Sequence, residues 1–90
     1  MSPLRNAVLI DPADNVATVL AAIPSGSVVV WGGADGVVAR EPIPAGHKVA
    51  LAAIAPGQAI LKYGHPIGVA SQPIAVGQHV HTHNLTGQDV

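Results

Sequence analysis

A short pattern centred on glycine recurs three times in the second half of the chain and limits how it can fold. Each copy has an apolar residue, two variable residues, a glycine, two more variable residues and a β-branched residue. The copies occupy residues 43–49, 54–60 and 74–80, at offsets of 11 and 20 residues. Glycine tolerates the positive φ angle of a tight turn, and β-branched residues favour strands. The pattern therefore predicts a recurring turn that leads into a strand, and its unequal spacing argues against a solenoid.

Strands separated by such turns predict a mainly β protein. With 90 residues the chain has room for one small domain, so we treat residues 1–90 as a single unit. A glycine-rich turn is expected over residues 32–36. The expected strands cover residues 7–10, 28–31, 48–53, 59–63, 67–70 and 78–83. Short strands and frequent Gly-Pro turns indicate a compact, bent β unit.

One short helix is expected near the start of the chain. Asp11 can cap it, Pro12 suits its first position, and Asp14 places an acid near its N-terminus. A proline and a glycine close behind the apolar stripe would end this helix. The apolar stripe, with helical spacing, is formed by Val16, Val19, Leu20 and Ile23.

The composition suggests a surface that is partly covered by another protein. Apolar residues make up 49% of the chain and charged residues only 10%, whereas a typical domain has about 25% charged residues. A poorly charged exterior indicates contact with a second subunit, either another copy of the chain or a different protein. The alternative is a soluble monomer whose exterior is mostly Gly, Pro, Ala and Thr.

Charge and sequence content exclude several classes of protein. The net charge is −1 and the four basic residues are scattered, so nucleic-acid binding is not expected. The absence of cysteine excludes disulfides and thiolate metal sites. No segment approaches the roughly 18 apolar residues of a membrane span, and the first residues lack the features of a signal peptide. We therefore expect a cytoplasmic protein that does not bind membranes.

Three of the five histidines, His79, His81 and His83, occupy alternate positions near the end of the chain. On a strand they would share one face, about 6.5–7 Å apart given a rise of ~3.3 Å per residue. Neutral imidazole is the commonest protein metal ligand and suits Fe, Zn, Ni or Cu. The run therefore predicts a divalent metal site, with Asn84 placed to end the strand and orient a ligand. The alternatives are an exposed polar face of an edge strand, or histidines that serve only as hydrogen-bond donors.

Two other segments carry candidate site residues. His47 and Lys48 follow the glycine of the first repeat, so similar hairpins could bring His47 near the histidines of the third. Lys48 can hold a carboxylate or a phosphate. Tyr63 is a candidate proton donor, or else a half-buried strand residue with a hydrated hydroxyl. No His-Glu-x-x-His motif and no Ser/His/Asp arrangement is present.

Taken in order, these motifs resemble the small SAF-type module of the altronate/galactarate dehydratase family, and the small subunit of sulfolactate sulfo-lyase. The motifs are Gly-His-Lys-Val-Ala-Leu, Ile-x-x-Gly, Lys-Tyr-Gly-x-Pro-Ile-Gly and Ile-x-x-Gly-x-His-Val-His-x-His-Asn, within residues 40–85. The resemblance implies a β-clip fold. It also implies a large partner chain, or a fused large domain, that completes a metal-dependent lyase acting on hydroxylated sugar acids.

The resemblance also implies roles for individual residues. It places His47 and Lys48 in catalysis, with Lys48, Asn84 and also Tyr63 in contact with the substrate. The metal ligands would be His79, His81 and His83, and Fe(II) is the expected ion, with other divalent metals as alternatives. Two positions depart from the family pattern, which has Glu at the position of His65 and often Arg at that of Val69. These departures leave the identity of the acid open.

Elimination of water or sulfite beside a carboxylate needs a base for the α-proton, stabilisation of the enolate, and help for the leaving group. The five acidic residues are spread over the chain and form no evident carboxylate pair. We therefore expect a subunit that contributes one wall of an active site. The alternatives are a stand-alone β-clip module that binds a small anionic ligand, or a structural cap that mediates oligomerisation.

Overall fold

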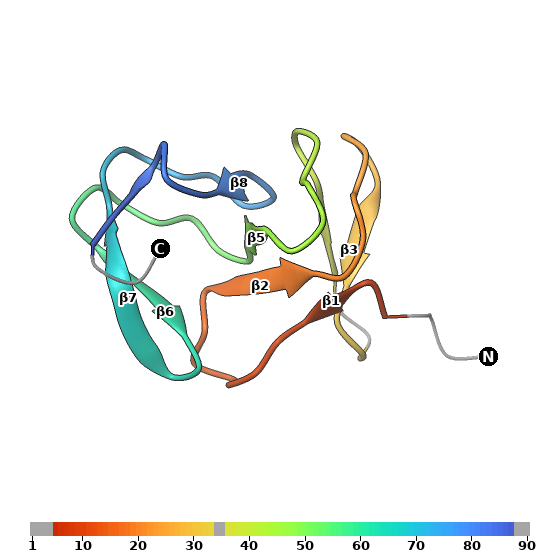
Figure 1. Cartoon of the computed structure of the whole chain (residues 1–90), viewed down its shortest axis with the longest axis horizontal. Helices are drawn as coiled ribbons and strands as arrows, with labels where there is room; N and C mark the ends of the chain where they lie inside the picture. Colours follow the sequence, from red (N-terminus) through yellow and green to blue (C-terminus); the bar gives the residue numbers. More distant parts are fainter. Residues whose placement is uncertain (1–4, 34–35, 88–90) are drawn as a thin grey trace.

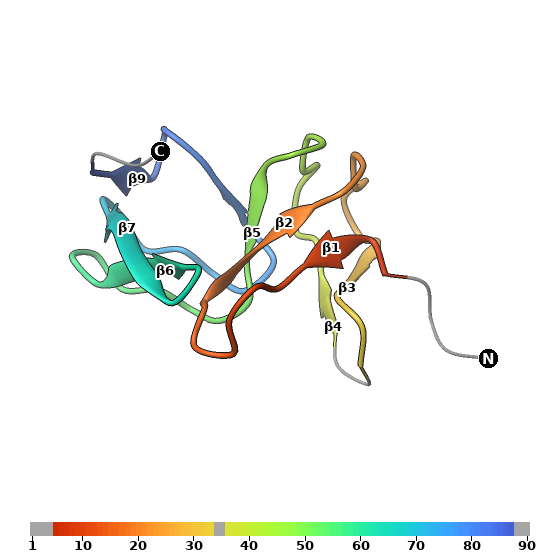
Figure 2. The same ribbon diagram turned by 60° about the horizontal axis from the view of Figure 1, so that its bottom comes forward.

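The computed structural model describes residues 5–33 and 36–87 and arranges them as short antiparallel strands in three small sheets. The central sheet has the strand order β1-β2-β5-β8, and it lies between a β3-β4 hairpin and a β6-β7-β9 sheet (Figure 1, Figure 2). The strands are β1 (Ala7–Val8), β2 (Val16–Val19), β3 (Val28–Val30), β4 (Gly36–Val38), β5 (Lys48–Ala50), β6 (Ala59–Lys62), β7 (His65–Ala70), β8 (His79–Val80) and β9 (Leu85–Thr86). The mainly β architecture is thereby confirmed.

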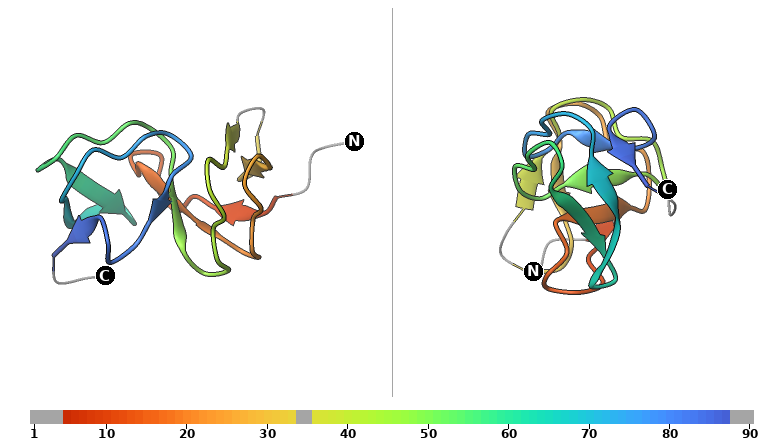
Figure 3. Two further views of the ribbon diagram at one scale, coloured as in Figure 1. Left: turned by 90° about the horizontal axis from the view of Figure 1, so that it is seen from above. Right: turned by 90° about the vertical axis from the view of Figure 1, so that its left-hand side faces the viewer.

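Each face of the central sheet carries its own hydrophobic core. Val16, Ala50 and Val80 pack with buried residues of β6, β7 and β9. Ala17 and Val19 lie in the second cluster, with residues of the β3-β4 half. Figure 3 shows the two hairpins at opposite ends of the molecule, with the central strands between them. Because alternate residues of a strand point to opposite faces, β2 is buried on both sides.

The predicted turn is confirmed, and the structure shows a fourth copy at residues 23–29. The four central glycines, Gly26, Gly46, Gly57 and Gly77, all have φ between +82° and +89°. Isolated bridges join the copies in two pairs, at Ile23↔Ile43 and Ile54↔Ile74. The positive φ explains why glycine recurs at this position.

The two pairs of turns belong to two equivalent halves of the chain, 31 residues apart. The Gly26 N–H donates to the Ala39 carbonyl and the Gly57 N–H to the Ala70 carbonyl, each at 2.7 Å. The β3-β4 and β6-β7 hairpins are related by the same offset. The unequal spacing of the turns thus arises from a duplicated unit that contains two turns.

The helix expected after Asp11 is wrong, because that segment forms a turn followed by β2. The Asp14 N–H donates to the Asp11 carbonyl at 2.9 Å, and the Ala13 N–H donates to Asp11 Oδ1 at 2.9 Å. Leu20, which belonged to the proposed apolar stripe, is 57% exposed. Burial on both faces produced an apolar run that imitated helical spacing. No helix occurs among residues 5–33 and 36–87, and so none there could cross a membrane.

Several strand boundaries also differ from expectation. The strands β2, β4 and β9 were not predicted, and β8 ends at Val80, well before residue 83. Residues 82–84 form a turn instead. Ala34 and Asp35, in the predicted glycine-rich turn, lie outside the described residues.

Asp14 and Asn15 fasten the β6-β7 hairpin to the loop before β2. The two carboxylate oxygens of Asp14 accept the N–H groups of Tyr63 and Gly64, at 3.0 and 2.8 Å. Asn15 Oδ1 accepts the Leu61 N–H at 2.8 Å, and Asn15 Nδ2 donates to the Ala59 carbonyl at 3.0 Å. We call these two residues the hairpin clamp, because four hydrogen bonds fix β6 and its turn against the central sheet.

Candidate functional site

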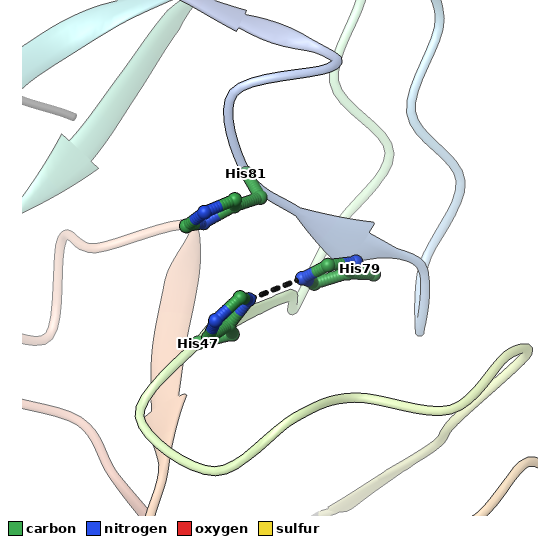
Figure 4. Close-up of side chains that lie close together, drawn as sticks. All are labelled: His47, His79 and His81. Atoms are coloured by element: carbon green, nitrogen blue, oxygen red, sulfur yellow. Dashed lines mark hydrogen bonds between the residues drawn. The ribbon is translucent and has the colours of Figure 1, made fainter.

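Three imidazoles converge at the β5-β8 edge of the central sheet. They belong to His47, just before β5, to His79 in β8, and to His81, just after β8 (Figure 4). Each offers a ring nitrogen, and the three nitrogens lie within 4.8 Å of one another. His47 Nδ1 lies 2.7 Å from His79 Nε2. Because a neutral imidazole has one N–H and one bare nitrogen, one of these rings donates to the other. We call these three residues the histidine cluster.

The strand register explains how the cluster forms. Antiparallel pairing places Val49 opposite His79 and Lys48 opposite Val80. One step further along the same register, His47 lies opposite His81. The two rings stack with centroids 4.0 Å apart and an interplanar angle of 19°. The expectation that similar repeats would bring His47 to the other histidines is therefore confirmed.

His81 supplies the observation that most favours a bound ligand. Its Nδ1 is buried and has no hydrogen-bond partner among the described residues. Buried polar atoms are nearly always satisfied, and an ion is one recognised explanation where they are not. Three imidazoles that lie this close together are also a suitable donor set for a divalent transition metal.

The surroundings keep two of the rings neutral. Burial lowers the pKa of His79, and the neighbouring His47 and His83 lower it further, against the opposing effect of Glu41. The pKa of His81 is also lowered, first by burial and then by His47 and Lys48. Neutral imidazole is the form that binds metals. His79 and His81 are therefore in their metal-binding form at neutral pH.

His83 lies outside the three-residue group. Its side chain is exposed, and its ring centroid lies 5.2 Å from that of His79 with a tilt of 40°. The expected common strand face is wrong, because β8 ends at Val80 and the chain then turns. The role of His83 as a metal ligand stays a prediction.

Asn84 holds the turn that carries these histidines. It is buried; its Oδ1 accepts the His81 N–H at 3.0 Å, and its Nδ2 donates to the His79 carbonyl at 2.9 Å. Both polar ends of the side chain are thus used by the backbone. Asn84 positions the histidines, and its predicted contact with substrate stays a prediction.

Comparison with known proteins identifies the family. The model of the altronate/galactarate dehydratase SAF domain matches residues 5–88. The chain belongs to this family. Its architecture is accordingly that of a SAF domain, a β-clip-like fold, as expected.

Two of the similar curated proteins, both altronate dehydratases, are much longer than this SAF domain. Altronate dehydratase of Bacillus subtilis strain 168 is 38% identical over 81 residues, which cover 90% of this chain and 16% of that protein. Altronate dehydratase of Escherichia coli strain K12 is 44% identical over 77 residues, 86% of this chain and 15% of the relative. (2R)-Sulfolactate sulfo-lyase subunit alpha of Paracoccus pantotrophus is 48% identical over 48 residues, 53% of this chain and 72% of the subunit. The chain thus spans about a sixth of the two dehydratases.

Lys48 and Tyr63 lie outside the histidine cluster of the SAF domain. Lys48 is only 8% exposed, and burial, together with the charge of Lys62, lowers its pKa. Tyr63 is 54% exposed in the β6-β7 turn with φ of 58°, so it is not a half-buried strand residue. The Nζ atom of Lys62 lies 4.9 Å from the centroid of the Tyr63 ring. The roles of Lys48 and Tyr63 toward a substrate stay predictions.

Glu41 is a site residue that the sequence did not reveal. Its Oε2 accepts the His79 N–H at 3.0 Å and so anchors the edge strand β8 from the loop before β5. No motif marks this acid, because its contact depends on the fold bringing residues 38 positions apart together. Glu41 therefore helps to fix the backbone that presents His79.

The lowered pKa values predict how stability depends on pH. As pH falls below 6.5, the ordinary value, histidines in the unfolded chain take up protons before His79 and His81 do so in the folded chain. The free energy of unfolding of the metal-free SAF domain should therefore decrease between pH 7 and pH 5. Urea denaturation with a chelator present measures this. The non-titrating variant His81→Gln should lose less stability over the same range, and an equal loss in both proteins would contradict the assignment.

Proposed function

We propose that this SAF domain is the small component of a two-component, metal-dependent hydro-lyase that dehydrates a sugar acid such as altronate or galactarate. The observation that carries the proposal is the histidine cluster, with the unpaired buried nitrogen of His81. The names of the similar altronate dehydratases support it, and the chain spans only about a sixth of their length. A large catalytic partner chain would correspond to the rest of those dehydratases. A cytoplasmic location is part of this proposal.

The donor set fits a transition metal. His47, His79 and His81 would hold the ion, with His83 close to His79 as a further candidate. An all-imidazole set suits Fe, Zn, Ni or Cu better than Mg or Ca, and Fe(II) is the ion we expect. When bound, such an ion polarises oxygens of an acid substrate and stabilises the charge of an enolate.

The residues of the chain itself would bind and orient the substrate. The Lys48 ammonium can pair with a carboxylate, and the buried position makes that pairing stronger than in water. For His47 we favour a role as metal ligand over contact with substrate, because its ring nitrogen lies close to those of His79 and His81. Glu41 holds the backbone N–H of His79, and Asn84 holds that of His81. The general base and the remaining ligands would come from the large chain.

A sulfo-lyase is the second candidate. The similarity to sulfolactate sulfo-lyase subunit alpha supports it, since the matched segment spans 72% of that subunit. In that case the complex would release sulfite from a hydroxysulfonate. A stand-alone module that binds a small anionic ligand without catalysis is the third candidate, because ligand-binding histidines need not serve a reaction.

The first test is the native composition of the protein in its own cells. Purified at low ionic strength, it should elute with a much longer second chain and with a bound transition metal, and the complex should dehydrate altronate or galactarate. Release of sulfite from sulfolactate would select the second candidate. The 90-residue chain alone, or with copies of itself only, would refute the two-component lyase.

A further inference from the structure

The turn of the β6-β7 hairpin holds Tyr63 in a conformation that a tyrosine rarely adopts. The turn has two residues between the paired Lys62 and His65, and both have a positive φ, 58° for Tyr63 and 74° for Gly64. Such a turn favours Asn-Gly, and a bulky side chain at its first position is strained. Tyr63 is the only non-glycine residue with a positive φ in the part of the chain that the structure describes. Strain of this kind persists where the side chain has a use that offsets it.

Asp14 enforces this conformation from the loop before β2. Its buried carboxylate accepts the N–H groups of Tyr63 and Gly64, and Asp14 Oδ2 also accepts the Asp11 N–H at 3.2 Å. One side chain therefore joins the hairpin turn to the neighbouring loop through three hydrogen bonds. A surface that is fixed in this way loses little conformational entropy when it binds a partner.

The joined turns present apolar side chains to solvent, together with one positive charge. Tyr63 is 54% exposed, and Ile10, the residue before Asp11, is 53% exposed. The Lys62 ammonium lies 4.9 Å from the centroid of the Tyr63 ring. A protein surface that fits this turn would offer an apolar pocket for the ring and a carboxylate for the ammonium.

The hairpin turn and the histidine cluster belong to opposite ends of β2. The hairpin clamp directly precedes Val16, the first residue of β2, whereas Val19, the last, donates its N–H to the His47 carbonyl. Figure 1 shows the turn between β6 and β7 beside the start of β2 and away from β8. The Tyr63 ring is therefore available to another protein while the histidine cluster holds a metal.

We propose that this turn is the surface through which the SAF domain binds the large chain of the lyase, with Tyr63 as its central contact. The inference rests on the proposed function, because it takes that large chain as the partner. In the two altronate dehydratases the matched segment is 16% and 15% of the protein, so the same fold there belongs to a much longer chain. Tyrosine is also among the residues that contribute most to the affinity of protein interfaces.

The substitution Tyr63→Asn separates the use of the ring from the stability of the fold. Asparagine suits the positive φ, so the variant should be at least as resistant to urea as the wild-type chain. Its affinity for the long chain that co-purifies with the native protein should fall about tenfold or more, as measured by titration calorimetry. Tyr63→Phe keeps the ring and should keep most of the affinity. Leu20→Asn is the matched control, since it removes an apolar side chain of similar exposure, 57%, just beyond the other end of β2.

The outcomes distinguish this contact from the function on which it rests. Unchanged affinity in Tyr63→Asn, or an equal loss in Leu20→Asn, would overturn the proposal, and a raised KM at unchanged affinity would assign the ring to the substrate instead. A complex that needs Tyr63 to form but does not dehydrate altronate or galactarate would keep the contact and refute the lyase. A complex that dehydrates the acid and forms equally well with Tyr63→Asn would keep the lyase and refute the contact. A wild-type chain that elutes alone or only with copies of itself would refute both.

Discussion

Replacing His47 and His81 together by alanine should lower the affinity of the chain for a divalent transition metal by at least about 100-fold. Two of the three converging imidazoles are lost, and His79 alone cannot hold the ion in competition with water. In the complex, turnover of the sugar acid should fall by about 1,000-fold or more, because the stabilisation of negative charge is lost with the ion. Binding of Co(II), followed by its visible absorption, measures the first effect without relying on activity.

The double variant should remain folded, which makes the test interpretable. The contacts that hold these residues use their backbones: the His47 carbonyl accepts the Val19 N–H, and the His81 N–H donates to Asn84 Oδ1. Alanine retains both contacts. His65→Ala is the matched control, since it removes an exposed imidazole of β7 that lies outside the cluster. Co(II) affinity that stays unchanged in the double variant, or that falls equally in His65→Ala, would refute the assigned ligand set.

The site was only partly predictable from the sequence. The repeats correctly indicated that His47 would meet the last histidines, because equivalent turns pair β5 with β8. The prediction that His79, His81 and His83 share one face of a strand was wrong, because that arrangement requires a longer strand than β8. Whether β8 continues depends on Asn84, whose side chain closes the turn through two backbone contacts. Such contacts depend on tertiary structure and leave no periodic signal.

The segment from Val16 to Ile23 was also wrongly predicted from its sequence pattern. Its apolar spacing fits a helix, but Val16 and Val19 belong to two different cores on opposite faces of β2. Periodicity cannot separate a strand buried on both faces from a buried helix. The fourth repeat at residues 23–29, with Gly26 at its centre, carried the missing information. In the other three copies of the turn a strand ends seven or eight residues before the central glycine, as β2 does before Gly26.

Gly77→Ala should destabilise the fold by about 3 kcal/mol or more, which is the largest stability effect we expect from a single added methyl group. A residue other than glycine at a positive φ costs about 1–2 kcal/mol. At Gly77 the new Cβ would also lie deep inside the van der Waals radius of the Val38 carbonyl oxygen and press on the Arg40 side chain. Overpacking of this kind adds about 1–3 kcal/mol. The Gly77 carbonyl also accepts the Arg40 N–H, so displacement of Gly77 would weaken its hydrogen bond to the segment that follows β4.

Gly57→Ala separates the backbone strain from the overpacking, because Gly57 and Gly77 occupy the same position in two copies of the turn. Their φ angles are +82° and +86°, but a Cβ at Gly57 would meet no atom within 4 Å. It should therefore cost only the backbone strain of about 1–2 kcal/mol. Urea denaturation of the two variants measures the difference. Co(II) binding should weaken in Gly77→Ala alone, since Gly77 lies two residues before His79, whereas Gly57 lies in the turn before β6. Equal destabilisation by the two substitutions would show that Gly77 packs less tightly against Val38 than the structure indicates, and unchanged Co(II) binding in Gly77→Ala would show that the histidine cluster does not depend on this packing.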